Sequence, residues 1–245
     1  MQLAQSIRIR NRIALALSPL WKAFRGLKSH PNLAEVYPEY LFLSHSIVRA
    51  SVPLMQDALT RAEKISAQDP LAAQLCPYFT KHITEEKDHD LWLLEDFEEL
   101  GLDRAALLCR VPPPAIAAMV GGQYYWIRHY HPVALLGYIA VLEGYPPRVE
   151  DINEMAERSK LPRAAFRTLM RHACLDPSHN RELDALIDAL PLAQEQLTSI
   201  CVNGVATVRL ASTAFAELLR HDESPAVPGA SFQDSFGLPE LTCPV

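Results

Sequence analysis

The chain has 245 residues, of which 49% are hydrophobic and 21% are charged, and its net charge is −6 at neutral pH. This length allows one or two domains and a full hydrophobic core. The acidic balance argues against nucleic-acid binding, and no apolar run reaches the roughly 18 residues of a membrane span. Neither common glycine-rich phosphate-binding motif occurs, so the usual nucleotide-binding loops are not supported.

The N-terminal segment and the cysteines bear on the cellular compartment. Residues 1–17 contain Arg8, Arg10 and Arg12 and no acidic residue. They lack an apolar core followed by a small-residue cleavage site, so we do not expect a secretory signal, although a basic, acid-free start is also typical of transit peptides. The five cysteines show no CxxC spacing, which favours reduced thiols. We therefore expect a cytoplasmic protein.

The hydrophobic pattern is helical almost throughout the chain. A first long helical segment is expected over residues 33–50, continuing past Pro53 to about residue 65. Over residues 78–100 the apolar side chains recur near the helical period, and Gly101 is suited to end that helix. Further helices are expected over residues 115–130, 133–143, 149–159, 163–175, 181–190 and 192–221.

These elements predict an all-α fold with a single helical bundle. Residues 6–13 alternate Ile and Arg, but one short strand cannot form a sheet. We expect a basic N-terminal segment or helix over residues 1–30, the bundle over residues 31–221, and a tail containing Pro, Gly and Ser over residues 222–245. The last helix is apolar on more than one face, which predicts a central helix or a homodimer interface.

A first polar motif occupies the predicted helix over residues 78–100. His82, Glu86 and His89 follow the spacing i, i+4 and i+7, so they share one helix face, with Glu85 at its edge. The same stripe continues with apolar residues, which indicates that this face points inward. Buried polar side chains need hydrogen-bond partners or a metal ion.

Two further polar features complete the pattern. His172, Asp176 and His179 repeat the i, i+4 and i+7 spacing on another helix. Glu143 is a lone acid at the end of an apolar helix. An ionised carboxylate buried alone is costly and tends to take up a proton unless a cation lies nearby.

Each feature also has a purely structural interpretation. The first motif alone is compatible with a solvated helix face. Asp176, which precedes Pro177, is compatible with the N-cap of a helix that restarts there. Glu143 is compatible with an ion pair to Arg49 or Arg128. Three inward polar stripes in one bundle nevertheless favour a metal site. Imidazole and carboxylate suit iron, including Fe(II) that activates oxygen, but zinc uses the same donors.

Taken together, the motifs resemble the haem-oxygenase-like di-iron oxidases and oxygenases, which belong with the thiaminase II and pyrroloquinoline-quinone synthase C superfamily. The motifs are HxxEExxHD at 82–90, GYxxVLEG at 137–144 and HxxxDxxH at 172–179. The resemblance spans roughly residues 35–220. It implies an up-down bundle of about seven helices and a non-haem iron site, in an enzyme that uses O2 to oxidise a small molecule.

The resemblance also implies the metal ligands. They are Glu86, His89, Glu143, His172, Asp176 and His179, with His82, Glu85 and His45 as less certain candidates. Glu143 is also expected to be catalytic, beside the substrate. Some relatives take a carboxylate from the first bundle helix, but residues 42–56 contain no acid here, so one of two expected Fe(II) ions should be labile. Pro177 is expected to tilt His179 away from the rest of its motif.

Other functions are compatible with the same residues. In a metal-free oxidase resembling pyrroloquinoline-quinone synthase C, a polar aromatic wall would be formed by His129, His131, Tyr124, Tyr125, Tyr130 and Arg128. A thiaminase-like hydrolase needs an activated cysteine, which has no recognisable setting here. A non-catalytic binding module would use the polar stripes only as a buried network. Tyr138 and Trp126 are expected to line an apolar substrate pocket, although the sequence specifies neither the substrate nor the reaction outcome.

Overall fold

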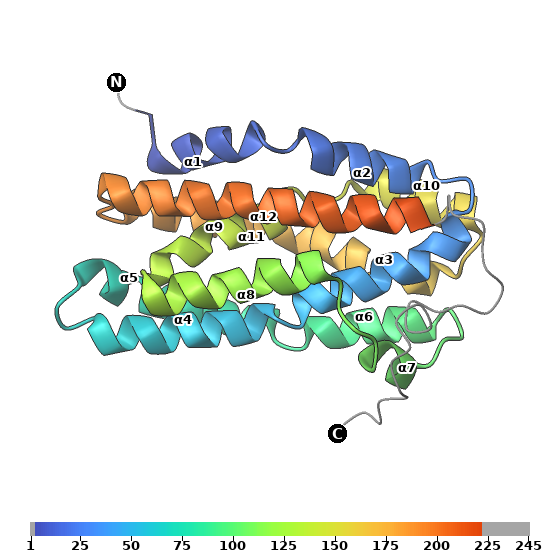
Figure 1. The fold of residues 1–245 in the computed structure, drawn as a ribbon, viewed down its shortest axis with the longest axis horizontal. Coiled ribbons are helices and arrows are strands. Elements are labelled where there is room, and N and C mark those ends of the chain that lie inside the picture. The colour runs from blue at the N-terminus through green and yellow to red at the C-terminus, as the bar shows by residue number, and fades with distance from the viewer. Residues whose placement is uncertain (1–2, 222–245) are drawn as a thin grey trace.

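In this computed structural model, residues 3–221 are described, and they form an all-helical bundle without a strand (Figure 1). The expected all-α class is therefore confirmed. The helices are α1 (Gln5–Ala14), α2 (Ser18–Lys28), α3 (Leu33–Val48), α4 (Ser51–Ile65), α5 (Pro70–Glu86), α6 (His89–Glu98), α7 (Arg104–Leu108), α8 (Pro114–His129), α9 (Leu135–Leu142), α10 (Val149–Ser159), α11 (Arg167–Ala189) and α12 (Gln194–His221). Two short 3-10 helices are η1 (Pro132–Ala134) and η2 (Arg163–Phe166).

The expected number of about seven helices is wrong, because the part of the chain that the structure describes contains twelve α-helices. Several long helical stretches are broken into consecutive pieces. α3 and α4 are separated by residues 49 and 50, and α5 and α6 by Lys87 and Asp88. Asp88 has a φ of 67°, which interrupts the helix. The apolar period continues across each break, so periodicity alone does not reveal it.

α12 is the central helix of the bundle. It packs against α1, α2, α3, α8 and α9, and Figure 1 shows α1 and α2 running along one side of it. Among the described residues, its stretch Gln194–Arg220 is the one long enough and apolar enough to cross a membrane, with a mean hydropathy of 1.2, but 61% of that window is buried inside the bundle. Core packing therefore accounts for its apolar character, and a homodimer stays a prediction.

A close crossing between α9 and α12 fixes the position of α9. A Cβ atom on Gly137 would lie 2.1 Å from the carbonyl oxygen of Ile200 and 2.8 Å from the amide nitrogen of Gly204. Any larger residue would push the two backbones apart. Because α9 ends at Leu142, this crossing also determines where Glu143 enters the bundle.

α11 does not stop at Pro177, contrary to the expected division into two helices. It runs through Arg167–Ala189 with Pro177 inside. Proline removes one helical hydrogen bond, but surrounding packing holds the helix together. His172, Asp176 and His179 therefore stay on one helix, and the last two are buried.

The basic N-terminal segment is also helical. Ile9 and Ile13 of α1 are fully buried, while Arg10 on another face forms an ion pair with Asp184 of α11 at 2.7 Å. The alternation of Ile and Arg thus belongs to an amphipathic helix rather than a strand. The predicted tail, residues 222–245, lies outside the described residues.

Candidate metal centre

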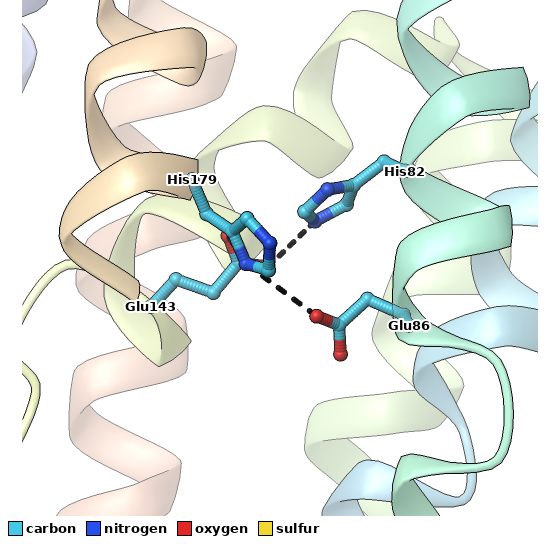
Figure 2. A group of neighbouring side chains, drawn as sticks. All are labelled: His82, Glu86, Glu143 and His179. Carbon is cyan, nitrogen blue, oxygen red and sulfur yellow. Dashed lines mark hydrogen bonds and ion pairs between the residues drawn. The ribbon is translucent and has the colours of Figure 1, made fainter. Parts of the chain in front are cut away.

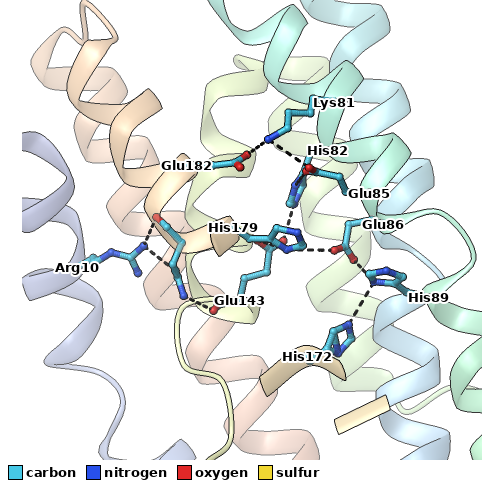
Figure 3. A network of polar contacts seen from close by, with 11 residues as sticks. Arg10, Lys81, His82, Glu85, Glu86, His89, Glu143, His172, His179 and Glu182 are labelled. Carbon is cyan, nitrogen blue, oxygen red and sulfur yellow. Dashed lines mark hydrogen bonds and ion pairs between the residues drawn. The ribbon is translucent and has the colours of Figure 1, made fainter. Parts of the chain in front are cut away.

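Imidazole and carboxylate side chains from α5, α6, α11 and the end of α9 meet inside the bundle (Figures 2 and 3). Among the described residues they form two groups that share Glu86. The four-residue group is His82, Glu86, Glu143 and His179, and the three-residue group is Glu86, His89 and His172. Within each group, one donor atom from every residue lies within 4.8 Å of the others.

The four-residue group leaves two buried atoms without a hydrogen bond. His82 Nε2 hydrogen-bonds with Glu143 Oε1 at 2.8 Å. His179 Nδ1 lies 3.5 Å from Glu86 Oε1 and 3.8 Å from Glu143 Oε2. Neither His179 Nδ1 nor Glu143 Oε2 has a hydrogen-bond partner among the described residues. Since buried polar atoms are normally paired, a cation between these two atoms would satisfy both.

The three-residue group is held by an aromatic stack. His89 Nδ1 lies 3.0 Å from Glu86 Oε2, and His172 Nε2 lies 3.4 Å from His89 Nδ1. The His89 ring stacks on Trp92 at 3.8 Å between centroids, and the Arg171 guanidinium lies 4.4 Å from the centroid of the same indole. These contacts fix the plane of the His89 ring next to Glu86.

The helix break at Lys87 and Asp88 places His89. The expectation of one continuous helix face through this motif is wrong, because α5 ends at Glu86 and α6 begins at His89. Aspartate is among the few residues other than glycine that adopt a positive φ readily. The ring of His89 nevertheless faces Glu86 from the start of its own helix (Figure 3).

In the four-residue group, burial and neighbouring charges act on the side-chain pKa values in opposite directions. Burial lowers the pKa of His82, but the hydrogen bond to Glu143 and the charges of Glu143 and Glu86 outweigh it and raise this pKa to about 9. Burial raises the pKa of Glu143. For Glu86, burial also acts upward, but the hydrogen bond and charge of His89 and the charge of His82 hold its pKa below the ordinary value.

Burial shifts the pKa values of two α11 side chains toward their uncharged forms. Burial, reinforced by the charges of Glu143 and Glu86, raises the pKa of Asp176 to about 8. Burial lowers the pKa of His172 to about 4. A neutral imidazole is the form that binds a metal ion. Asp176 belongs to neither group of donors.

A cavity of about 440 Å³ reaches the donors. Glu86, Glu143, His172 and Asp176 contribute to its wall, and the rest is mostly apolar side chains, including those of α2, α3, α4, α9 and α12. Its volume is typical of a pocket for a small organic molecule. Tyr138, expected to contact a substrate, lines this cavity.

The structure does not bring every candidate to the donors or the cavity. Trp126 lies half-buried on α8 against Tyr130 and is not part of the cavity wall. The residues of α8 that face the core are its neighbours, such as Ile127. His45 is buried but belongs to neither donor group. Glu85 lies at the edge, as expected, with its Oε2 3.6 Å from His82 Nδ1.

The residues of the metal-free alternative lie on the surface or in a separate contact. Tyr125 is 66% exposed, Tyr130 is 41% exposed and Arg128 forms a surface ion pair. His131 hydrogen-bonds with Asp69 at 3.1 Å, at the start of α5. None of these residues contributes to the cavity wall, so the structure does not support a substrate wall made from them.

A supporting contact that was not foreseen holds the backbone of Glu143. Asn180 Nδ2 donates a hydrogen bond to the Glu143 carbonyl oxygen at 2.6 Å, and Arg10 donates to Asn180 Oδ1 at 2.8 Å. Arg10 lies on α1, far away in the sequence. The position of Asn180 directly after His179 was the one local signal available.

The comparison with protein families covers the region of the chain that holds these donors. A sequence model described as the iron-containing redox enzyme family matches residues 54–212, more than half of the chain and the region that contains all members of both donor groups. The chain belongs to this iron-containing redox enzyme family. No curated protein matches the chain.

Solved structures resemble this family member in fold. A domain of unknown function with a heme oxygenase-like fold from Shewanella denitrificans OS217 superposes with a TM-score of 0.76 at 17% identity, covering 92% of this chain and 98% of that one. A TenA homolog from Pseudomonas syringae pv. tomato DC3000 gives 0.65 at 11% identity, covering 89% and 93%. The haem-oxygenase-like fold implied by the three motifs is thus confirmed.

Proposed function

We propose that this member of the iron-containing redox enzyme family is a non-haem iron oxidase or oxygenase that uses O2 to oxidise a small molecule bound in the cavity. The observation that carries the proposal is the buried pair His179 Nδ1 and Glu143 Oε2, which lie 3.8 Å apart and have no hydrogen bonds within residues 3–221. The cluster to which they belong opens onto a mostly apolar cavity. Leaving such atoms unpaired costs roughly 1–3 kcal/mol each, which a bound cation would offset.

The residues present fit iron. His82, Glu86, Glu143 and His179 would hold one Fe(II), and Glu86, His89 and His172 a second, with Asp176 as a further carboxylate on the cavity wall. Mixed imidazole and carboxylate donors suit iron, and the family description favours it over zinc. Bound iron would supply the activation of O2. The three-residue group offers fewer donors, so we expect its ion to be the more labile.

The side chains of the cluster have distinct parts in this proposal. Glu86 directs Oε1 toward His179 and Oε2 toward His89, so it is the carboxylate placed to bridge the two groups. Glu85 faces the outer nitrogen of His82 and would orient that ring. Asp176 lines the cavity beside these donors and would hydrogen-bond to a molecule bound there.

The apolar cavity wall would keep water away from the reacting group. We further propose a cytoplasmic location, which is supported by cysteines without CxxC spacing.

Anaerobic titration with Fe(II) tests the proposal. We expect up to two ions per chain in the parent, and at least tenfold weaker binding in Glu143→Gln and His172→Ala. Glu98→Gln, a surface change at an ion pair with Arg104, is the matched control and should bind iron like the parent. Oxygen uptake should require the iron-loaded form. Parent-like iron binding by both donor variants would overturn the proposal, and so would equal uptake without iron.

A further inference from the structure

Glu143 lies at a point where its own helix no longer fixes it. α9 ends at Leu142, and the next helix begins at Val149. The Glu143 amide still donates to the Ile139 carbonyl oxygen at 3.1 Å. Its own carbonyl oxygen, however, lies at the end of the helix, where carbonyls have no partner in a following turn. The position of the Glu143 backbone therefore depends on contacts from other parts of the fold.

Asn180 of α11 supplies the missing partner, and Arg10 of α1 orients it. Asn180 Nδ2 donates to the Glu143 carbonyl oxygen at 2.6 Å, while Asn180 Oδ1 accepts from Arg10 Nη2 at 2.8 Å. A guanidinium has only donors, so the Asn180 oxygen must face Arg10 and its nitrogen is left to face Glu143. Arg10 is itself fixed by Asp184, whose two carboxylate oxygens accept from Arg10 Nε at 2.7 and 3.0 Å.

The Arg10 guanidinium also packs against the backbone that follows Glu143. A Cβ atom on Gly144 would lie 3.1 Å from Arg10 Nη1 and 2.0 Å from the Ala140 carbonyl oxygen. A side chain at position 144 would therefore collide with the last turn of α9 and crowd Arg10, whereas glycine permits this close approach. Figure 3 shows Arg10 reaching from α1 toward Glu143.

The same turn of α11 carries a donor of the four-residue group. Asn180 directly follows His179, so one helical turn presents both the imidazole and the amide that holds Glu143. His179 Nδ1 and Glu143 Oε2, the two donor atoms without a hydrogen bond to any described residue, lie 3.8 Å apart. The hydrogen bond from Asn180 to Glu143 thus ties together the two backbones that set this separation.

A second polar contact attaches α1 to α11 away from the donors. The backbone amide and the hydroxyl of Ser6 donate to the Asp188 carboxylate at 2.8 and 2.9 Å. Asp188 lies eight residues after Asn180, or about 12 Å along the helix axis, and within residues 3–221 it belongs to neither donor group. The Ser6 contact therefore holds the same two helices together without holding Glu143.

We propose that Arg10 and Asn180 are positioning residues of the candidate metal centre. Together they hold the Glu143 backbone so that its carboxylate faces His179 before a metal ion binds. The proposal rests on the proposed function in taking these two side chains as iron ligands. It also gives α1 a part in the metal centre, although α1 lies outside residues 54–212, which match the family.

Anaerobic Fe(II) titration of the full chain tests this role. Asn180→Leu removes the donor to Glu143 and should weaken iron binding about tenfold, the usual effect of losing a group that orients a ligand. Arg10→Leu should weaken it about threefold, because Asn180 can still donate without being held. Ser6→Ala is the matched control: its midpoint of thermal unfolding should fall by about 2–4 °C, yet it should bind iron like the parent.

Amide hydrogen exchange of the metal-free protein gives a second readout that needs no iron. The Glu143 amide, which is bonded to the Ile139 carbonyl, should exchange about fivefold faster in Asn180→Leu. The reason is that the last turn of α9 opens more easily once the Glu143 carbonyl has lost its donor. Arg10→Leu should act in the same direction, and Ser6→Ala should leave this exchange unchanged. NMR spectroscopy of the full chain measures all three.

The results separate this inference from the proposed function. Parent-like iron affinity in Asn180→Leu, or an equal loss of affinity in Ser6→Ala, would overturn the inference and leave the proposed function standing. If the parent binds no iron, the proposed function fails and the exchange measurement decides. Faster exchange confined to Asn180→Leu and Arg10→Leu would uphold the positioning of Glu143, whereas unchanged exchange would overturn it.

Discussion

Two buried polar clusters in the bundle differ in how completely their atoms are paired. Gln123 of α8 and Asn203 of α12 exchange hydrogen bonds at 2.9 and 2.7 Å, and Asn203 also donates to the Ala134 carbonyl at 2.7 Å. In the donor cluster, formed by the two groups that share Glu86, Glu143 Oε2 and His179 Nδ1 have no hydrogen bond to any described residue. The amide cluster satisfies its own hydrogen bonds and joins two helices, whereas the donor cluster leaves these two atoms without a partner among the described residues, which is the basis of the proposed metal site. We therefore expect the amide cluster to support the fold and the donor cluster to bind a ligand.

The largest expected effect comes from removing the residue common to both donor groups. Glu86→Ala should reduce Fe(II) binding at least hundredfold and bring the stoichiometry close to zero, because both groups lose a ligand. Anaerobic titration measures this. Glu85→Gln, at the edge of the cluster, is the control and should weaken iron binding by about tenfold at most. If Glu86→Ala still binds one ion with parent affinity, Glu86 does not bridge.

Disrupting the amide cluster of Gln123 and Asn203 should lower the stability of the fold and leave iron binding unchanged. Asn203→Leu removes the partners of Gln123 and of the Ala134 carbonyl, which should cost about 2–4 kcal/mol of unfolding free energy. Urea unfolding of the metal-free protein measures the cost. The double variant Gln123→Leu/Asn203→Leu should recover part of it, because both amides are then replaced. A cost below about 0.5 kcal/mol would show that the amide cluster is not structural.

The two clusters should also differ in pH dependence. The folded pKa of Asp176, about 8, lies above its unfolded value of 3.8, so its contribution to stability is complete below pH 3.8 and is lost as the pH rises through 8. Between these limits the metal-free parent should lose up to about 1.4 kcal/mol per pH unit from this group. Asp176→Asn should lack that slope, as measured by urea unfolding at pH 5, 6 and 7.

The amide cluster supplies the control for this experiment, because it contains no titratable group. The difference between the parent and Asn203→Leu should therefore be independent of pH. Parallel pH profiles for the parent and Asp176→Asn would contradict the raised pKa of Asp176.

The smallest effect concerns the helix break beside the donors. Asp88→Gly should stabilise the metal-free protein by up to about 1 kcal/mol, because glycine adopts the φ of 67° without steric cost. Lys160→Gly, at a φ of 57° after α10, should give a similar gain away from the donors. Only Asp88→Gly should also weaken the more labile iron, about threefold, since a looser joint costs more entropy to order. Equal iron binding in both variants would mean that this joint is not coupled to the donors.

Local pattern was sufficient for some elements and not for others. The amphipathic helix expected over residues 149–159 is found as Val149–Ser159, because its polar and apolar faces alternate with the helical period and no break intervenes. The break at Lys87 and Asp88 was not predicted, since neither Gly nor Pro marks it. Pro177 was taken as a stop, although packing carries the helix through it.

The candidate site was predictable in its residue types but not in its pairings. His82, a less certain candidate, is the hydrogen-bond partner of Glu143 across 61 positions of sequence. Likewise, Glu86 belongs to both groups only because three helices meet at its carboxylate. The exclusion of Trp126 from the cavity follows from the rotation of α8 against its neighbours. These are tertiary relations that spacing along one helix does not contain.

The break at Asp88 has a mechanical consequence for the three-residue group. α6 begins with His89, and its Asp96 accepts a hydrogen bond from the Thr168 amide of α11 at 2.9 Å, one turn before His172. His89 and His172 therefore lie on two helices, α6 and α11, that this hydrogen bond connects, while Glu86 lies on α5, on the other side of the helix break. An ion bound by Glu86, His89 and His172 would connect α5 to the α6–α11 pair across the helix break. Iron loading should therefore slow amide hydrogen exchange on both sides of residue 88 together.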